Sequence, residues 1–293
     1  MPLSYNNTRM KEMIRGGAFE DIRMGEAVGA AATALRSVLH RVRQAAERSG
    51  RVPGQVRLVA VSKTKPAALI RELYDTGHRC FGENYVQEFL DKAPQVFSFF
   101  FCFCLCGVDF TGLDWLFASL FQLPEDIQWH FVGHLQSNKV KSLLAAVPNL
   151  FMVEGVDNQK LANHLDRAVL SIGRNPLKVL VQVNTSGEAS KYGVEPSSCV
   201  ELAKHVKLGC PHLEFSGLMT IGMKDYASTP ENFRTLLNCR SEVCKALQIT
   251  EDHCELSMGM SGDFEKAIEM GSTNVRIGSI IFGPRSYPKG PDS

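Results

Sequence analysis

Two lysines directly follow a short apolar run near the start of the chain. Lys63 stands one serine after "VRLVAV", and Lys65 follows two residues later. A lysine at the mouth of a buried strand loses part of its hydration, which lowers the pKa of the amine and lets it form a Schiff base with an aldehyde or ketone. In extended backbone the two side chains would share a face. The sequence alone therefore leaves open which lysine is the nucleophile and whether either is more than a solvated side chain.

Two glycine- and serine-rich loops near the end of the chain have the chemistry of an anion site. Ser261 belongs to the first loop, and Gly278 and Ser279 belong to the second. Glycine allows close backbone approach, and free N–H groups and hydroxyls bind phosphate oxygens. The alternative is that Ser261 only caps the following helix. Asp263 and Glu265 lie in the first turn of that helix and would repel a phosphate unless they point away from it.

Arg276 stands inside the last apolar run, "NVRIGS". A guanidinium buried in this way needs an acceptor, which Glu154 or a heteroatom of a ligand could supply. If the ligand were a pyridine ring, an arginine at its nitrogen would disfavour protonation there and weaken the ring as an electron sink. His130 and His134 are four residues apart, but in a strand that spacing separates them by more than about 10 Å, so we expect no metal site.

The sequence around these residues repeats one unit, a short apolar run followed by an amphipathic helical pattern. After a helical pattern over about 27–49, eight short apolar runs alternate with amphipathic helical patterns. This alternation predicts parallel strands with right-handed crossovers, and eight units in about 235 residues match an α/β fold of the (β/α)8 (TIM) barrel type. A doubly wound open sheet is the alternative. The predicted strands are 56–62, 79–83, 128–134, 150–155, 177–184, 213–222, 254–259 and 274–279.

Such a barrel collects its chemistry at the carboxyl ends of its strands. Lys63 follows the first predicted strand, Asn84 follows the second, and Arg276 lies in the eighth. The two glycine- and serine-rich loops follow the seventh and eighth strands, where barrels of this type commonly hold a phosphate. The fold prediction therefore brings an amine, a guanidinium and an anion cradle to one mouth of the barrel. Asn84 would be either a ligand contact or the N-cap of the next helix.

The composition limits the classes of partner that the chain suits. Its 293 residues include 32 Lys and Arg and 31 Asp and Glu, so no broad basic surface is available for nucleic acid or anionic lipid. A small molecule is the expected partner. Three of the nine cysteines cluster at 102–106 and six are scattered singly, which is typical of a reducing compartment. The N-terminus has no signal-peptide pattern, which favours a cytoplasmic location, with a mitochondrial pool as the alternative.

One segment does not fit the barrel pattern. "FSFFFCFCLCGVDFTGLDWLFASLF", residues 97–121, has no Lys or Arg and only two acids, Asp109 and Asp114. It is long enough to cross a bilayer, but each acid would cost about 2.5–3.5 kcal/mol near the bilayer centre, and a span would separate two strands of one sheet. We interpret it as an insertion at about 97–122, opposite the ligand, that is dispensable for fold and ligand and does not contact a membrane. A splice variant or a translated non-coding tract would explain its composition.

Six motifs together carry a resemblance to a known family. They are "LVAVSKTKP", "FGENYVQE", "WHFVGHLQSNK", "VNTSGEASKYG", "GLMTIG" and "LSMGMSGDFEKAIEMGSTNVRIGSIIFG", in the order of the predicted strands. From about residue 26 to residue 287, apart from the insertion, the chain resembles the pyridoxal phosphate homeostasis proteins. The resemblance implies an alanine-racemase-like barrel, preceded by an N-terminal helix, that holds pyridoxal 5′-phosphate (PLP) as a Schiff base on Lys63. It also implies Arg276 at the pyridine nitrogen and a site completed by Asn84, Met258, Ser261, Gly278 and Ser279.

On this interpretation the chain has a disordered N-terminal extension over 1–24, a PLP-binding barrel over 25–288 and a tail over 289–293. The resemblance implies buffering of PLP inside the cell or its delivery, for example to PLP-dependent apoenzymes. No robust catalysis is expected, because racemases of this barrel type take a second base from a C-terminal domain that we do not expect here. The alternatives are a weak PLP-dependent amino-acid racemase or lyase, since one lysine can shuttle a proton, and a PLP-free aldolase acting on a phosphorylated sugar.

Overall fold

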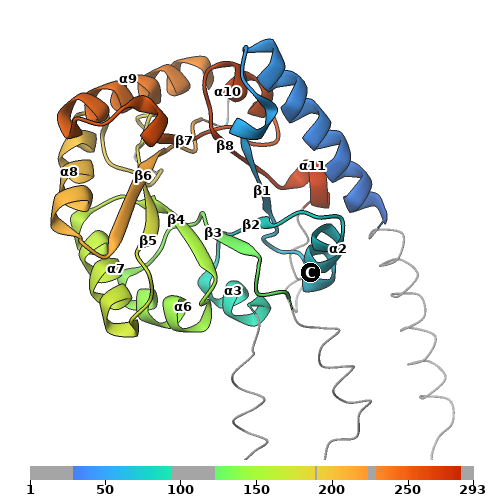
Figure 1. Cartoon of the computed structure of the whole chain (residues 1–293), viewed down its shortest axis with the longest axis horizontal. Helices are drawn as coiled ribbons and strands as arrows, with labels where there is room; N and C mark the ends of the chain where they lie inside the picture. The colour runs from blue at the N-terminus through green and yellow to red at the C-terminus, as the bar shows by residue number, and fades with distance from the viewer. Residues whose placement is uncertain (1–28, 94–122, 189, 224–228, 285–293) are drawn as a thin grey trace, which may run out of the picture.

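The computed structural model describes residues 29–93, 123–188, 190–223 and 229–284. Its strands form one closed barrel of parallel strands in sequence order, in which β8 pairs with β1 (Figure 1). The predicted barrel is therefore confirmed, and the open sheet is excluded. The strands are β1 (Arg57–Val61), β2 (Cys80–Glu83), β3 (Gln128–Phe131), β4 (Leu150–Val156), β5 (Leu177–Gln182), β6 (Leu213–Met219), β7 (Glu255–Ser257) and β8 (Asn274–Ile277).

Helices surround the barrel and cover the outward-facing side chains of the strands (Figure 1). They are a first helix over residues 29–48, then α2 (Ala67–Asp75), α3 (Val86–Lys92), α6 (Val140–Ala146), α7 (Gln159–Ile172), α8 (Cys199–Gly209), α9 (Thr229–Leu247), α10 (Phe264–Glu269) and α11 (Ser279–Phe282). The local sequence explains their limits, as α7 illustrates. Asn158 caps its first turn by accepting a hydrogen bond from Leu161 N at 2.8 Å, and Gly173 ends it in the left-handed conformation, with φ of 73°.

The first helix covers the outside of the barrel next to its closure. Leu35, Val38 and Val42 are buried in the same core cluster as the outward-facing residues of β1 and β8. The helix is held to α10 by an ion pair of 2.8 Å between Arg41 and Glu265. Because α10 and α11 are short, this N-terminal helix supplies the apolar cover that the strands need on that side (Figure 1).

Alternation along the strands decides which side chains enter the barrel. On β1, Leu58 and Ala60 belong to the outer core, whereas Val59 and Val61 pack with Val132 in a separate cluster inside the barrel. Val59 is paired with Arg276 across the closure of the barrel. Neighbouring partners in a sheet point to the same face, so Arg276 also points inward.

Three sequence predictions lie outside the described residues: the N-terminal extension over 1–24, the insertion at about 97–122 and the tail over 289–293. The six cysteines in the described part of the chain are all free thiols. Within that same part, no helix has the length and apolar character needed to cross a membrane.

Candidate functional site

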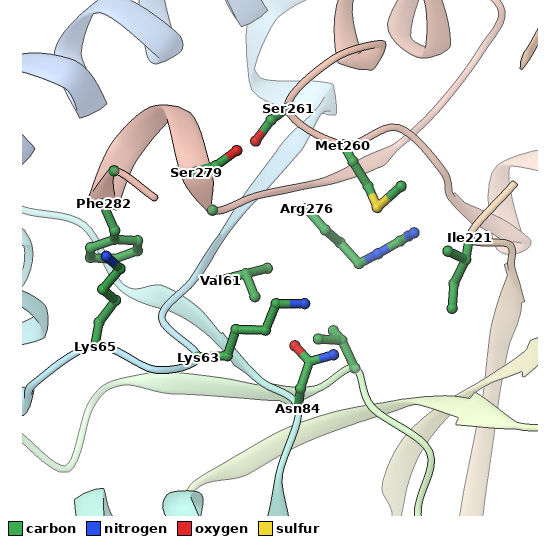
Figure 2. Close-up of a pocket in the computed structure, with 13 residues that line it drawn as sticks. Val61, Lys63, Lys65, Asn84, Ile221, Met260, Ser261, Arg276, Ser279 and Phe282 are labelled. Atoms are coloured by element: carbon green, nitrogen blue, oxygen red, sulfur yellow. The ribbon is translucent and has the colours of Figure 1, made fainter. Parts of the chain in front are cut away.

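A cavity of about 270 Å³ opens at the carboxyl ends of the strands, where the barrel fold predicts the site. Five of the predicted residues line it from the connections after β1, β2, β7 and β8, and Arg276 lines it from inside β8. These five are Lys63, Asn84, Ser261, Gly278 and Ser279. The residues that line it are Val61, Lys63, Lys65, Asn84, Val132, Ile221, Met260, Ser261, Arg276, Gly278, Ser279, Phe282 and Gly283. Figure 2 shows Lys63 and Arg276 pointing toward the middle of the cavity, with Ser261 and Ser279 at its edge.

The structure separates the two candidate lysines. Residues 62–65 form a turn instead of continuing β1, so Lys63 and Lys65 do not share a face. Lys63 points toward Arg276 (Figure 2). Lys65 lies at the side of the cavity near Phe282, where its amine donates a hydrogen bond of 2.5 Å to the Pro284 carbonyl. Burial lowers the pKa of the Lys65 amine. Of the two lysines, Lys63 is therefore the one whose amine points to the middle of the cavity.

Arg276 is held in the barrel by acceptors from two neighbouring strand ends. Its Nη1 atom donates to Ser257 Oγ at 2.5 Å, and its Nη2 atom donates to the Thr220 carbonyl at 2.7 Å. Glu154, the acceptor that the sequence suggested, lies 3.9 Å from Nη1. Burial lowers the pKa of the Arg276 guanidinium and the charge of Glu154 opposes that shift, but an arginine side chain stays protonated in either case. The sequence showed no sign of the roles of Ser257 and Thr220, because each is an isolated hydroxyl residue near the end of an apolar strand.

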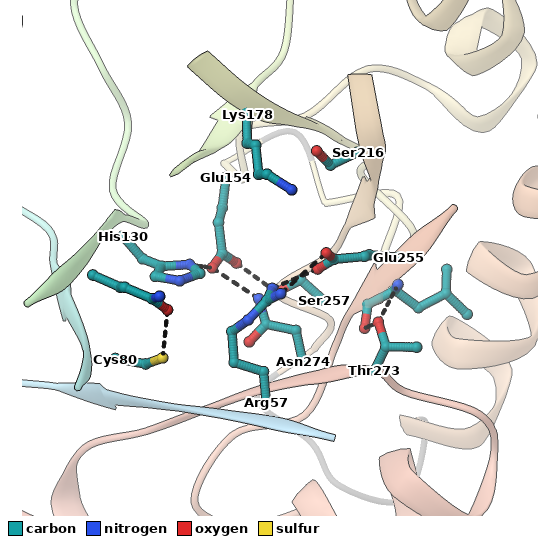
Figure 3. Close-up of polar contacts among 12 residues, drawn as sticks. Arg57, Cys80, His130, Glu154, Lys178, Ser216, Glu255, Ser257, Thr273 and Asn274 are labelled. Atoms are coloured by element: carbon teal, nitrogen blue, oxygen red, sulfur yellow. Dashed lines mark hydrogen bonds and ion pairs between the residues drawn. The ribbon is translucent and has the colours of Figure 1, made fainter. Parts of the chain in front are cut away.

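Below the cavity, Glu154 is the centre of a buried polar network (Figure 3). Its Oε1 atom lies 2.7 Å from His130 Nδ1 and accepts a hydrogen bond of 3.0 Å from Asn274 Nδ2, and its Oε2 atom accepts one of 2.5 Å from Ser257. Burial alone would raise the pKa of Glu154, but the hydrogen bond and charge of His130, together with Arg276 and Ser257, lower it to about 2. Glu154 is therefore ionised and fixes the position of Arg276 from below.

The loops after β7 and β8 both reach the edge of the cavity, through Ser261 in one and Gly278 and Ser279 in the other. A Cβ atom on Gly278 would lie 3.0 Å from the Val61 carbonyl, so glycine lets this loop approach β1 closely. The two acids near the loop after β7 have different partners. Glu265 on α10 pairs with Arg41 on the N-terminal helix, and Asp263 accepts a hydrogen bond of 2.6 Å from Met260 N within the loop itself. Glu265 is therefore held away from the cavity, whereas Asp263 stays in the loop that carries Ser261.

Of the predicted site residues Asn84 and Met258, only Asn84 has its side chain at the cavity. Asn84 lines the cavity, and its Oδ1 atom is buried without a hydrogen-bond partner among the described residues. It is not the N-cap of α3, a position that Tyr85 occupies. The side chain of Met258 does not line the cavity but is fully buried in the outer core. Alternation explains why Met258 points outward like Leu256. Gly259, with φ of 99°, breaks the alternation beyond the end of β7, and Met260 lines the cavity.

The two histidines that stand four apart do not form one site. His130 is buried inside the barrel against Glu154, whereas His134 is exposed and stacks on Tyr192 with ring centres 3.7 Å apart. His134 Nδ1 lies 3.5 Å from a carboxylate oxygen of Asp157. Among the described residues, no group of three or more His, Cys, Asp or Glu side chains is arranged to hold a metal ion.

Comparison with known proteins places this geometry in a family. Residues 34–286 match the family described as alanine racemase, N-terminal domain. The pyridoxal phosphate homeostasis protein of Homo sapiens is 50% identical over 266 residues, which cover 88% of each chain. The chain belongs to the pyridoxal phosphate homeostasis protein family. A family member from Aquifex aeolicus is 38% identical over 258 residues, which cover 86% of this chain and 97% of its own.

Solved structures extend the comparison. PipY of Synechococcus elongatus, whose structure has PLP bound, is 31% identical with a TM-score of 0.64, covering 86% of this chain and 100% of its own. An alanine racemase from Corynebacterium glutamicum is 13% identical with a TM-score of 0.56, covering 89% of this chain and 62% of its own. At that identity the racemase shows the shared barrel fold alone.

Proposed function

We propose that this chain binds PLP in the cavity between Lys63 and Arg276, and that it buffers or delivers PLP inside the cell, in the cytoplasm. The observation that carries the proposal is the convergence of an amine, a guanidinium and two glycine- and serine-rich loops in one cavity of small-molecule size. PLP presents an aldehyde, a pyridine nitrogen and a phosphate, so each part of the cofactor has a matching group. The names of the relatives and the PLP bound to PipY support the same cofactor.

The residues of the cavity fit PLP in detail. Ser261 and Ser279 offer hydroxyls at the edge of the cavity, and the Gly278 loop, which packs closely against β1, also lines it, which suits the phosphate. Asn84 Oδ1 is buried without a partner in the described part of the chain, so it has hydrogen-bonding capacity left for a ligand. Bound PLP would supply an aldehyde carbon that exchanges one amine for another.

Two residues decide what the site does with the cofactor. Lys63 forms a Schiff base when its amine replaces the aldehyde oxygen, which leaves as water. Arg276 donates to Ser257 and Thr220 and carries a permanent charge, so it disfavours a proton on a pyridine nitrogen beside it. An unprotonated pyridine is a weak electron sink, which disfavours chemistry at the α-carbon of an amino acid. Reversible amine exchange remains, and it suits a protein that holds PLP and passes it to acceptors such as PLP-dependent apoenzymes.

Borohydride reduction of the purified chain with PLP, followed by intact and peptide mass analysis, tests the proposal. The expected result is one pyridoxyl phosphate adduct on Lys63 that Lys63→Ala abolishes and that Lys204→Met, an exposed change on α8, does not affect. Amino-acid turnover that is lost in Lys63→Ala would establish the weak racemase or lyase instead. A folded chain that forms no adduct would refute PLP binding through Lys63 and favour the aldolase.

A further inference from the structure

Lys63 lies in a turn that its own residues do not favour. The Ser62 carbonyl accepts a hydrogen bond of 3.0 Å from Lys65 N, which closes the turn over Lys63 and Thr64. Thr64 has a φ of 60°, in the left-handed region where glycine or asparagine usually stands at this position of a turn. A β-branched residue with positive φ is an outlier that persists only where its surroundings impose it. The chain around Lys63 must therefore be held from outside the turn.

A buried ammonium group lies behind this turn. The Lys92 side chain on α3 is only 9% exposed, and its Nζ atom donates to three oxygens at once. These are the Ser62 carbonyl at 2.8 Å, Glu83 Oε1 at 2.8 Å and Glu88 Oε1 at 2.6 Å. An ammonium group has three N–H donors, so Lys92 is fully satisfied in this position.

The two carboxylates also contact the turn directly. Glu88 Oε1 accepts a hydrogen bond of 2.5 Å from Thr64 N, and Glu83 Oε1 accepts one of 2.7 Å from Ser62 Oγ. The residue before Lys63 is therefore held by its carbonyl and its hydroxyl, and the residue after Lys63 is held by its backbone N–H. Burial raises the pKa of Glu83, an effect that the charge and hydrogen bond of Lys92 oppose.

We propose that Lys92 and Glu88 are positioning residues for Lys63: they hold the strained turn in the one conformation that directs the Lys63 amine into the cavity. This inference rests on the proposed function, since it assigns a partner group to the same lysine. Lys92 and Glu88 do not line the cavity, so they act on the ligand only through the turn. Their contribution should therefore be limited to the step that depends on the Lys63 amine.

A comparison of two ligands separates that step from the rest of the site. PLP can form a Schiff base, whereas pyridoxine 5′-phosphate has the same ring and phosphate but no aldehyde. Lys92→Met and Glu88→Leu should weaken PLP binding by about tenfold or more, because a misplaced amine meets the aldehyde poorly. Binding of pyridoxine 5′-phosphate, measured by calorimetry, should stay within about twofold of the unchanged chain. Glu88→Gln keeps an acceptor for Thr64 N and should lose less than Glu88→Leu.

A rescue variant tests the role of the strained turn. Glycine adopts positive φ without strain, so Thr64→Gly should make the turn less dependent on Glu88. The loss of PLP affinity caused by Glu88→Leu should therefore be smaller in the Thr64→Gly background. A purely structural role of Glu88 predicts the same loss in both backgrounds. Lys204→Met serves as the matched control for loss of one lysine.

Two results would overturn the inference. One is an equal loss of affinity for PLP and for pyridoxine 5′-phosphate, which would mean that the variants damage the whole cavity. The other is unchanged PLP affinity in Glu88→Leu, a variant of a partly exposed residue that tests the inference even if Lys92→Met does not fold. Failure of the proposed function is distinguishable from both, because the unchanged chain would then form no adduct on Lys63.

Discussion

Arg276 Nη1 lies 3.9 Å from Glu154 Oε2, and the Ser257 hydroxyl joins the two with a hydrogen bond to each. Both charged side chains are almost fully buried, at 5% and 0% exposure. His130 lies on the far side of Glu154, with its Nδ1 atom 2.7 Å from the carboxylate. The guanidinium that faces the cavity is therefore held by a chain of contacts that reaches into the middle of the barrel.

Loss of the Glu154 charge should destabilise the whole barrel. Glu154→Gln keeps the shape of the side chain but leaves the buried Arg276 without its counter-charge, and breaking a buried pair in this way costs about 3 kcal/mol or more. Urea unfolding should show a corresponding decrease in the free energy of unfolding. Glu201→Gln, at an exposed position on α8, is the control and should change it by less than about 0.5 kcal/mol. Equal stability of the two variants would contradict the prediction.

The same carboxylate should make the fold sensitive to acid. The pKa of Glu154 falls from its ordinary 4.5 to about 2, because the contacts of His130, Arg276 and Ser257 outweigh burial. A lowered carboxyl pKa stabilises the folded state above the unfolded pKa, and this stabilisation is lost as the pH falls from about 4.5 toward 2. The loss should be about 3 kcal/mol. Unfolding free energies measured across this range should converge for the unchanged chain and Glu154→Gln; parallel curves would count against the assignment.

His78 should add a second pH dependence in a milder range. Its pKa falls from 6.5 to about 4, mainly because of burial and further because of the Arg79 charge, against the hydrogen bond of 2.8 Å between its Nε2 atom and the Cys80 carbonyl. The folded state therefore binds the proton less readily than the unfolded state. The free energy of unfolding should therefore be higher above pH 6.5, where His78 is neutral in both states. It should fall by about 2–3 kcal/mol as the pH decreases toward 4. His78→Gln should flatten the slope in that window, whereas His40→Gln, at an exposed position, should leave it unchanged.

Removal of the apolar segment 97–121, which we interpret as an insertion, should leave the site intact. The chain enters β3 at the end of the barrel opposite the cavity, where Asp126 pairs with Arg79 at 2.8 Å. Deleting 97–121 should keep the PLP affinity within about twofold, because the described residues that line the cavity lie at the other end of the barrel and the change in loop-closure entropy is small. A longer deletion that also removes Leu123, which is 3% exposed, should lower the melting temperature. Loss of PLP binding in the shorter deletion would show that the insertion is not dispensable.

Much of the fold was predictable because its signals are local. Each strand and helix is encoded by an apolar period that spans a few residues, and all eight strands were confirmed. The carboxyl ends of the strands in a barrel lie at one mouth, so the sequence alone predicts that Lys63, Asn84, Ser261 and Arg276 lie together. Met258 shows the limit of this approach, because one residue of alternation decides whether a side chain faces the cavity or the helices.

The sequence by itself determined the order of the strands, the position of Lys63 after β1 and of Arg276 in β8, and the glycine- and serine-rich loops after β7 and β8. Only the tertiary structure decided which lysine faces Arg276, since Lys92 and Glu88 from α3 hydrogen-bond the turn over Lys63 and Thr64 only in the folded barrel. The physical reason is that secondary structure depends on neighbours a few residues apart. The polar networks, in contrast, exist only when barrel closure and helix packing bring distant groups within hydrogen-bond distance and exclude water from them.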